Sequence, residues 1–386
     1  MIALVYDRKV DPWEQSKGLR KREVPTPDLD EAGDYHDAER VLVKPRFAGF
    51  CGSDRGIWFR RAFKDVIYDA LDRDARDLRV IGHELFGEIV EVGSAARRVH
   101  GFAPGDLVST ESHIVCGTCY QCRIGDGHVC QDARIIGITD DGCFAERIKL
   151  PANVLWPIDG GRIRPEVAAL CEPFGNAVHA CTKVPLRGKT VAIIGCGTIG
   201  LFAVAVARAL GARRVLGVEP VASHAQMARR LGADEIIAPT IDPGRGFHHD
   251  PTLAGKIREL TEGVGVDVAL EMSGTNDALN NAISAVRRGG DVILFGLKSG
   301  DAVIENFDRV IMDGIALHAV MGRRLWDTWH IGRNLLESHK SPIQDLIWEV
   351  ILNQGDGTVV PLSGWEPASF EERIRTFPKV LIDLAH

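Results

Sequence analysis

The chain has 386 residues, which is long enough for two or three domains with a sizeable core. Apolar residues make up 45% and charged residues 26%, so the composition is that of a globular protein and excludes a largely disordered chain. The formal charge is −7, from 46 basic and 53 acidic side chains, which argues against nucleic acid or an anionic membrane as the main partner.

The N-terminus carries its first charge at Asp7, too early for a secretory signal. An uncharged stretch from Thr190 to Ala207 is long enough for a membrane span, but it contains three glycines and is better explained as a buried strand followed by a helix. We therefore expect a soluble, cytoplasmic protein. In such a reducing compartment, clustered cysteines are more often zinc ligands than disulfides.

The first half of the chain predicts an irregular, mostly antiparallel β domain. Short β-like runs at 41–43, 87–92 and 106–108 are separated by turn residues. Residues 60–79 are charged with interspersed aromatics, which predicts a helical insertion. This insertion either reshapes the mouth of a substrate site or is a solvated surface helix.

From about Arg164 the pattern changes to an alternation of strands and helices, which indicates a doubly wound parallel sheet and an α/β fold. A loop rich in Gly, Pro and His is expected at 242–251, and a last strand at 379–382 is expected to return to the first domain. The predicted strands lie at 191–194, 214–218, 235–237, 266–270 and 291–295, and the predicted helices at 199–210, 223–231 and 276–287.

A glycine-rich turn with the pattern G-x-G-x-x-G lies between the predicted strand 191–194 and the helix after it. Such glycines let the backbone approach a pyrophosphate, and the helix N-terminus supplies free N–H groups. Glu219 follows the next strand, where a carboxylate binds the adenosine ribose and repels a 2′-phosphate. The pattern therefore predicts NAD rather than NADP; the alternative is a turn that binds nothing. The expected cofactor-binding residues of the turn are Gly195, Gly197, Thr198, Ile199 and Gly200.

Four cysteines lie within fifteen residues, and four thiolates at this spacing can close tetrahedrally on Zn²⁺. An iron–sulfur cluster and a zinc finger that reads nucleic acid are the alternatives. The spacing differs from that of common ferredoxins, and the neighbouring residues do not form a basic stripe. We therefore predict a structural zinc lobe at about 112–132, held by Cys116, Cys119, Cys122 and Cys130, and ordinary buried roles for Cys143, Cys181 and Cys196.

A second set of possible metal ligands is scattered along the chain. Cys51 and the pair His83-Glu84 lie in the β-rich half, and Cys171-Glu172 lies at the domain junction. Each alone is more often a core residue than a ligand. Together they supply a thiolate, an imidazole and carboxylates, the mixed set that a catalytic zinc with an open position needs. Their spacing does not by itself bring them together.

The order of these motifs resembles the zinc-dependent medium-chain dehydrogenase/reductase superfamily over nearly the whole chain. The resemblance implies a GroES-like catalytic domain at 1–163, completed by 325–386, and an NAD-binding Rossmann domain at 164–324. It also implies homodimers or homotetramers. Within the superfamily, several strings are similar to L-threonine 3-dehydrogenases, whereas sugar, inositol and polyol dehydrogenases share the zinc-site motifs. The strings are 113–117, 172–179, 271–274, and Gly322-Arg323 followed by Thr328-Trp329.

The resemblance implies the ligands of the catalytic zinc. They are Cys51, His83 and Glu172, with Glu84 beside the metal and able to exchange with water; Cys171 is the neighbouring alternative to Glu172. Coordination to Zn²⁺ lowers the pKa of an alcohol, which then gives up a hydride to NAD. The implied reaction is oxidation of a small secondary alcohol, either an amino-alcohol acid such as threonine or a polyol.

Further roles follow from the same resemblance. Ser53 matches the position that hydrogen-bonds the reacting hydroxyl, and His113 matches a histidine that contacts substrate. Gly56 stands where the family usually carries a proton-relaying histidine, so that relay must use another group. The resemblance also implies additional cofactor contacts at His224, Ser273, Gly274, Leu297 and Arg323.

The competing hypothesis is that the chain is a non-catalytic zinc protein. Such a protein needs only one zinc per chain.

Overall fold

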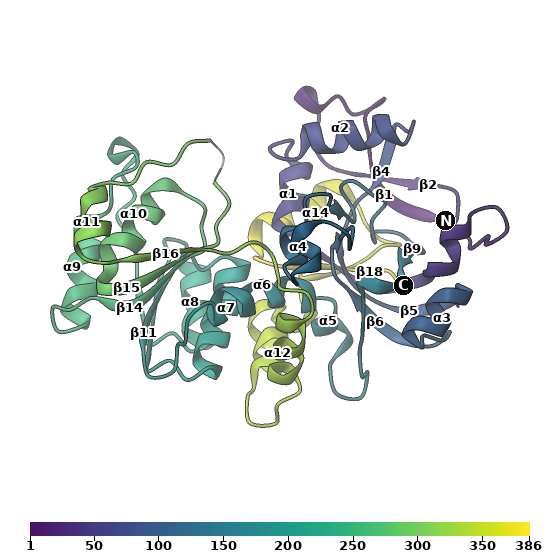
Figure 1. The fold of residues 1–386 in the computed structure, drawn as a ribbon. Helices are drawn as coiled ribbons and strands as arrows, with labels where there is room; N and C mark the ends of the chain where they lie inside the picture. The colour runs from purple at the N-terminus through teal and green to yellow at the C-terminus, as the bar shows by residue number, and fades with distance from the viewer. Residues whose placement is uncertain (299) are drawn as a thin grey trace. The chain divides into compact units, whose positions relative to one another are not determined.

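A computed structural model describes residues 1–298 and 300–386 (Figure 1). The chain folds into two units, which are described separately. Unit 1 comprises Met1–Pro173 and Leu352–His386, and unit 2 comprises Phe174–Ile351. The domain boundaries at 163 and 325 expected from the sequence stay a prediction. In the part of the chain that the structure describes, no helix is both long and apolar enough to cross a bilayer.

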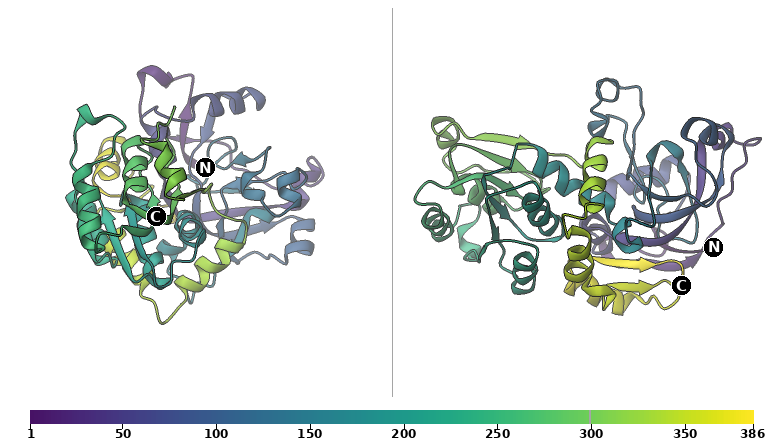
Figure 2. Two further views of the ribbon diagram at one scale, coloured as in Figure 1. Left: turned by 60° about the vertical axis from the view of Figure 1, so that its left-hand side comes forward. Right: turned by 90° about the horizontal axis from the view of Figure 1, so that it is seen from below.

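Unit 1 is built on a seven-stranded sheet in the order β10-β6-β5-β3-β18-β17, with β9 also paired to β3. Its pairs are antiparallel except β17 with β18, as the β-rich sequence predicted. The C-terminal strand β18 lies against β3, so the end of the chain returns to the sheet of its first half (Figure 2). The strands are β3 (Arg40–Phe50), β5 (Glu84–Val92), β6 (Leu107–Thr110), β9 (Ile148–Pro151), β10 (Leu155–Pro157), β17 (Val359–Pro361) and β18 (Val380–Asp383).

A second, three-stranded sheet of unit 1 has the order β2-β1-β4, formed by β1 (Ile2–Asp7), β2 (Arg20–Glu23) and β4 (Leu78–Val80). Between Cys51 and β4 the chain forms α1 (Gly52–Trp58) and α2 (Lys64–Arg73). The expected helix of the 60–79 insertion is therefore confirmed for 64–73, whereas its last residues belong to β4.

The insertion packs onto the core of unit 1. Ile67 and Leu71, four residues apart on one face of α2, are fully buried. The Tyr68 hydroxyl lies 3.0 Å from the Tyr6 hydroxyl. The Arg60 guanidinium lies over the Tyr6 ring at 4.7 Å. Helix α2 is therefore a surface helix with one face in the core and the other exposed, and its place at the mouth of a substrate site stays a prediction.

Unit 2 contains a six-stranded, all-parallel sheet in the order β13-β12-β11-β14-β15-β16. Helices cover it on two sides, as Figure 1 shows, which confirms the predicted doubly wound α/β fold. The predicted helix 276–287 ends at Ala285, because β15 begins at the next residue. The strands are β11 (Thr190–Ile194), β12 (Arg214–Val218), β13 (Glu235–Ile237), β14 (Val266–Glu271), β15 (Val286–Leu294) and β16 (Ala316–Ala319); the helices between them are α7 (Thr198–Ala209), α8 (Ala222–Arg230), α9 (Pro251–Leu260), α10 (Asn276–Ala285) and α11 (Phe307–Met312).

The remaining elements connect or flank these sheets. They are α3 (Ser94–His100), β7 (His113–Ile114), α4 (Tyr120–Arg123), β8 (Arg134–Ile135), α5 (Pro165–Ala168), α6 (Cys171–Thr182), α12 (Asp327–Leu336), α13 (Ile343–Leu346) and α14 (Pro367–Thr376).

Candidate catalytic metal centre and cofactor site

The pairing of β3 with β5 brings Cys51 close to His83 and Glu84. Gly49 of β3 lies opposite Glu84 of β5, and Cys51 follows at the end of β3, where α1 begins. One donor atom from each of Cys51, His83 and Glu84 lies within 4.8 Å of the other two. Residues that are more than thirty positions apart in the sequence therefore form one cluster, as expected of a metal site.

The charges around His83 favour a cation. His83 is 4% exposed; its Nε2 lies 3.3 Å from Ser53 Oγ and its Nδ1 lies 3.6 Å from the Asp54 carboxylate. Burial acts to lower the pKa of His83, but the charges of Asp54 and Cys51 outweigh it and raise that pKa to about 10. A cluster that holds a proton this strongly also suits a divalent cation bound by thiolate, imidazole and carboxylate.

Asp54 contacts both Cys51 and His83 of this cluster. Its carboxylate is fully buried and accepts a hydrogen bond from the Cys51 N–H at 2.8 Å. Burial raises the pKa of Asp54 to about 6. The Asp54 carboxylate lies 3.6 Å from His83 Nδ1, too far for a hydrogen bond, so it acts on His83 through its charge. The sequence showed Asp54 only as part of the Cys51 motif and gave it no role.

Glu84 has a partner that the sequence did not indicate. Lys379 Nζ donates to both carboxylate oxygens of Glu84 at 2.8 Å and lies 3.3 Å from the Phe50 carbonyl oxygen. A Cβ at Gly49 would come within 1.9 Å of Glu84 Oε2, so only glycine leaves room for this carboxylate. The one available signal was a lysine directly before the apolar strand β18.

Glu172 lies near the same cluster. It is buried at the start of α6, and its charge contributes to the raised pKa of His83. Among the described residues, the third side chain with a donor atom within 4.8 Å of those of Cys51 and His83 is Glu84, rather than Glu172 or Cys171. Which of these three side chains completes a zinc shell stays a prediction.

His113 is held by a buried carboxylate. Its backbone N–H donates to Glu111 Oε1 at 3.0 Å, and its Nδ1 lies 3.0 Å from the same oxygen. Ser112 Oγ lies 3.2 Å from Nδ1. The orientation of the imidazole is therefore fixed by Glu111, which the sequence analysis did not identify. The substrate contact predicted for His113 is not tested by this geometry.

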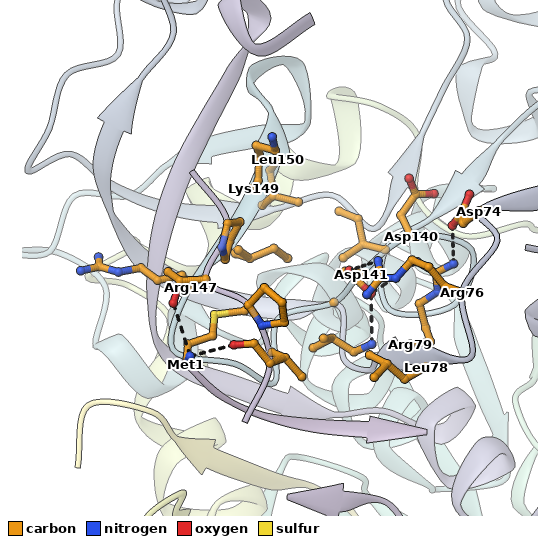
Figure 3. A pocket seen from close by; sticks show the side chains of 18 of the residues that line it. Met1, Asp74, Arg76, Leu78, Arg79, Asp140, Asp141, Arg147, Lys149 and Leu150 are labelled. Carbon is orange, nitrogen blue, oxygen red and sulfur yellow. Dashed lines mark hydrogen bonds and ion pairs between the residues drawn. The ribbon is translucent and has the colours of Figure 1, made fainter. Parts of the chain in front are cut away.

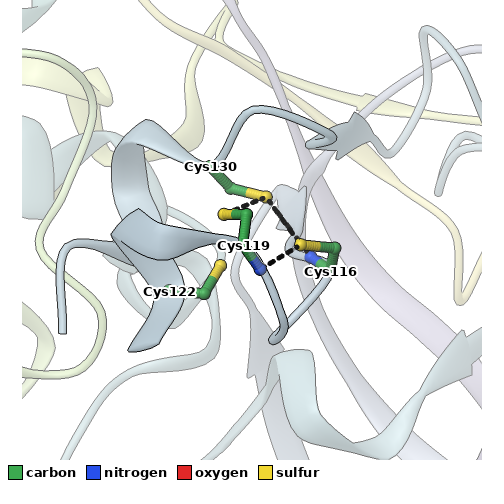
Figure 4. A group of neighbouring side chains, drawn as sticks. All are labelled: Cys116, Cys119, Cys122 and Cys130. Carbon is green, nitrogen blue, oxygen red and sulfur yellow. Dashed lines mark hydrogen bonds between the residues drawn. The ribbon is translucent and has the colours of Figure 1, made fainter. Parts of the chain in front are cut away.

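The four clustered cysteines converge as the spacing predicted (Figure 4). Cys130 Sγ lies 3.5 Å from Cys116 Sγ and 3.8 Å from Cys119 Sγ. The backbone N–H groups of Thr118 and Cys119 lower the pKa of Cys116 to about 6, which favours the thiolate that zinc requires. All four thiols lie within 4.8 Å of one another, which suits a closed structural zinc site. Cys143, Cys181 and Cys196, which lie outside both predicted zinc sites, are buried, as expected.

The glycine-rich turn between β11 and α7 fits a dinucleotide. Gly195 has φ +92°, and a Cβ there would come within 2.9 Å of the Ser273 Cβ. A Cβ at Gly200 would come within 2.0 Å of the Gly195 carbonyl oxygen, whereas one at Gly197 would meet nothing within 4 Å. Two glycines therefore permit the tight turn, and the third leaves its backbone open to a ligand. Thr198 and Ile199 open α7, as predicted.

Glu219 lies against this turn. Its carboxylate accepts the Cys196 N–H at 2.7 Å and the Val221 N–H at 2.8 Å. A carboxylate held beside the glycine turn is the feature that binds a ribose diol and disfavours a 2′-phosphate. His224 lies in α8, where it is half-buried.

The other predicted cofactor residues follow β14 and β15. Glu271 Oε1 accepts hydrogen bonds from Ser273 N and Oγ, both at 2.7 Å, and from Gly274 N at 2.9 Å. Gly274 lies so close to the Leu297 backbone that a Cβ there would come within 2.4 Å of its carbonyl oxygen. Glu271 therefore holds the Ser273-Gly274 turn in place, and the sequence did not indicate this role. Arg323 is buried and donates to Asn176 at 3.0 Å.

One large cavity of unit 1 lies away from these residues (Figure 3). It measures about 770 Å³, and its walls include none of the predicted site residues. At one end of it Arg79 pairs with Asp74 at 2.6 Å and Arg76 pairs with Asp141 at 2.5 Å. Its size therefore gives no reason to place the chemistry there.

Comparison with known proteins agrees with this geometry. Residues 37–160 match the alcohol dehydrogenase GroES-like domain, and residues 198–338 match the zinc-binding dehydrogenase family. The L-threonine 3-dehydrogenase of Pyrococcus horikoshii is 38% identical over 309 residues, which cover 80% of this chain and 82% of that protein. That of Symbiobacterium thermophilum is 35% identical over 355 residues, 88% of this chain and 92% of the relative.

Solved structures show the same fold. Galactitol-1-phosphate dehydrogenase from Escherichia coli aligns with a TM-score of 0.78 at 24% identity over 99% of this chain and 100% of that one. The 2R,3R-butanediol dehydrogenase from Bacillus subtilis aligns with a TM-score of 0.78 at 23% identity over 99% of both chains. The chain therefore belongs to the zinc-dependent medium-chain dehydrogenase/reductase superfamily, and it is an NAD-dependent zinc alcohol dehydrogenase.

Proposed function

We propose that the protein oxidises the secondary hydroxyl of L-threonine to the 3-keto acid with NAD as the hydride acceptor. The observation that carries the chemistry is the convergence of Cys51, His83 and Glu84 donor atoms within 4.8 Å. The choice of threonine is supported by the relatives of that name, which are 34–38% identical.

The residues of the metal centre have distinct roles in this proposal. Zn²⁺ held by Cys51, His83 and a carboxylate of Glu84 or Glu172 would lower the pKa of a bound alcohol. Ser53 Oγ, which lies 3.3 Å from His83 Nε2, hydrogen-bonds the hydroxyl and takes its proton outward. The Asp54 carboxylate adds negative charge 3.6 Å from His83 Nδ1. Since Gly56 offers no imidazole, the proton leaves Ser53 through water.

The residues of unit 2 hold the hydride acceptor. NAD supplies the electrophilic ring, and the protein contributes binding and orientation. Glu219 and the turn at Gly195 hold the adenosine half. Glu271 fixes the Ser273-Gly274 turn against the glycine-rich turn.

The test combines zinc counting with steady-state kinetics. The purified protein should contain two zinc ions per chain, one for each donor group of the structure, and turn over L-threonine faster than a panel of polyols. Cys51→Ser should abolish turnover while NAD binding survives, and Cys181→Ser, which changes a buried thiol outside both groups, should keep activity. Faster turnover of a polyol would show that a polyol, and not L-threonine, is the substrate. An active Cys51→Ser enzyme would show that Cys51 is not a ligand of a catalytic metal.

We also infer a cytoplasmic homo-oligomer, a dimer or tetramer. The convergence of four thiols on a zinc-type site, which needs reduced cysteines, supports a reducing compartment, and the family resemblance supports self-association. Light scattering of the purified protein gives its subunit number, and a monomer at micromolar concentration would contradict the inference.

A further inference from the structure

The loop between β13 and α9, residues 239–250, has no part in the function so far. It contains a short 3₁₀ turn, Pro243–Arg245. Asp250, which is buried, closes the loop at its base: its carboxylate accepts the Thr240 N–H at 2.7 Å and caps α9 through the Thr252 N–H at 2.9 Å. The two ends of the loop are therefore tied together.

Other polar side chains hold the C-terminal part of this loop, residues 247–250. Asn280 Nδ2 donates to the Phe247 carbonyl at 2.7 Å, and Asn281 Oδ1 accepts the Asp250 N–H at 2.6 Å. The His249 N–H and Nδ1 meet Glu305 Oε2 at 2.9 and 2.7 Å. Because the backbone is held by so many side-chain bonds, the 239–250 loop presents a defined surface.

That surface forms one wall of a cavity of about 400 Å³ in unit 2. The opposite wall consists of the carboxyl ends of β11 and β12 and the first turns of α10, including Ile194, Val218 and Ala278. Gly195 of the glycine-rich turn also lines it, so the cavity continues the dinucleotide site. Cavities at this edge of a doubly wound sheet are where a nucleotide base is bound. The walls are mostly apolar, as a flat aromatic base requires.

Arg245 is the one cationic side chain among the described residues that line this cavity. Its side chain is 18% exposed; Nη1 donates to the Thr240 carbonyl at 3.0 Å and lies 3.7 Å from the Asp250 carboxylate. Two loop contacts thus hold the guanidinium at the cavity wall before any ligand arrives. A planar cation in this position can stack on an aromatic ring.

We propose that Arg245 is a cofactor-positioning residue whose guanidinium packs against the adenine ring of NAD. Glu219 then holds the ribose, and the 239–250 loop holds the base. The proposal concerns cofactor binding alone, so it does not depend on which alcohol the enzyme oxidises.

Calorimetric binding to the zinc-loaded enzyme tests this proposal. Arg245→Leu should weaken NADH and ADP-ribose binding by about 2- to 30-fold, the range for a cation over an aromatic ring. The affinity for reduced nicotinamide mononucleotide, which lacks adenine, should stay unchanged. Arg245→Lys keeps the charge but loses the plane, and should recover less than half of the loss in binding free energy.

The matched control is Arg258→Leu. Arg258 lies on α9 and donates to the Ser284 carbonyl at 3.2 Å outside the cavity, so this variant should bind ADP-ribose like the unmodified enzyme. Full ADP-ribose affinity of Arg245→Leu would overturn the proposal. Wild-type affinity of Arg245→Lys, or an equal loss of mononucleotide binding, would also overturn it, because neither result is compatible with stacking on adenine.

Discussion

Both carboxylate oxygens of Glu84 accept hydrogen bonds from Lys379, 295 positions later in the chain, each at 2.8 Å. Neither side chain is more than 2% exposed. The pair connects β5, which carries the metal-site residues, with the residue that precedes the C-terminal strand β18. Lys379 therefore neutralises the negative charge of Glu84 within the protein. A metal bound by Cys51 and His83 is not the only cation available to this carboxylate.

Removal of this lysine should be costly. Lys379→Met would leave the Glu84 carboxylate buried without its cation, which destabilises proteins by about 3–5 kcal/mol. Urea unfolding of the zinc-loaded protein measures the loss. Lys17→Met, which breaks an exposed pair with Glu371, should cost less than about 1 kcal/mol. Equal unfolding curves for the two variants would mean that the buried pair contributes little.

The Glu84–Lys379 pair also shows where the sequence stops being informative. Cys51, His83 and Glu84 could be proposed as ligands because their residue types carry metal chemistry. Lys379 could not, because its role arises only when β18 pairs with β3, a strand more than 300 positions earlier in the chain. Asp54 was missed for the same reason, because only the fold brings His83 beside it. Glu111 lies two residues before His113, so that contact is local, but the burial of the Glu111 carboxylate against the imidazole is a property of the fold.

The parallel sheet was more predictable. Its strands are short apolar runs between helical segments, so β11 to β14 were found within one residue of their bounds. Strand β16 was not predicted, because Ala316-Leu317-His318-Ala319 contains only one large apolar residue. The other edge strand, β13, was found because it carries the apolar pair Ile236-Ile237. A run of large apolar residues therefore identifies a strand even at the sheet edge, and a strand without such a run is missed.

The packing of the insertion can be tested on α2. Leu71→Ala removes a fully buried side chain and should destabilise the protein by about 2–5 kcal/mol. Val66→Ala on the same helix changes a side chain that is 42% exposed and should stay within about 0.5 kcal/mol. Thermal or urea denaturation compares the two. If both variants are equally stable, α2 is not packed as described.

The four-cysteine lobe should bind one of two zinc ions. Cys130→Ser removes a thiol that lies within 4 Å of two others, so the variant should contain one zinc per chain instead of two. Its melting temperature should fall, because structural zinc contributes directly to folding. Metal analysis after dialysis gives the count. An unchanged count of two would assign the metal to other ligands.

Acid stability should depend on Glu305. Partial burial acts to raise the pKa of Glu305, but the His249 backbone N–H and the side chains of His248 and His249 lower it to about 2. A carboxyl whose pKa is lower in the folded state stabilises the fold above its unfolded pKa of about 4.3, and this contribution is lost as pH falls toward 2. Glu305→Gln should therefore lose less stability than the unmodified protein between pH 5 and 3, as measured by urea unfolding. Glu262→Gln, on an exposed residue, serves as control and should follow the unmodified protein.

Cofactor choice should depend on the charge of Glu219. The carboxylate accepts two backbone N–H groups and is 5% exposed, so a 2′-phosphate placed beside the ribose would meet a fixed negative charge. Glu219→Gln keeps an oxygen acceptor but removes the charge. Its ratio of kcat/KM for NAD over NADP should fall at least about tenfold, equivalent to about 1.4 kcal/mol. Glu219→Ala also removes the acceptor, so it should lose affinity for NAD as well as selectivity. If Glu219→Gln keeps the full preference for NAD, steric exclusion by the turn rather than charge selects the cofactor.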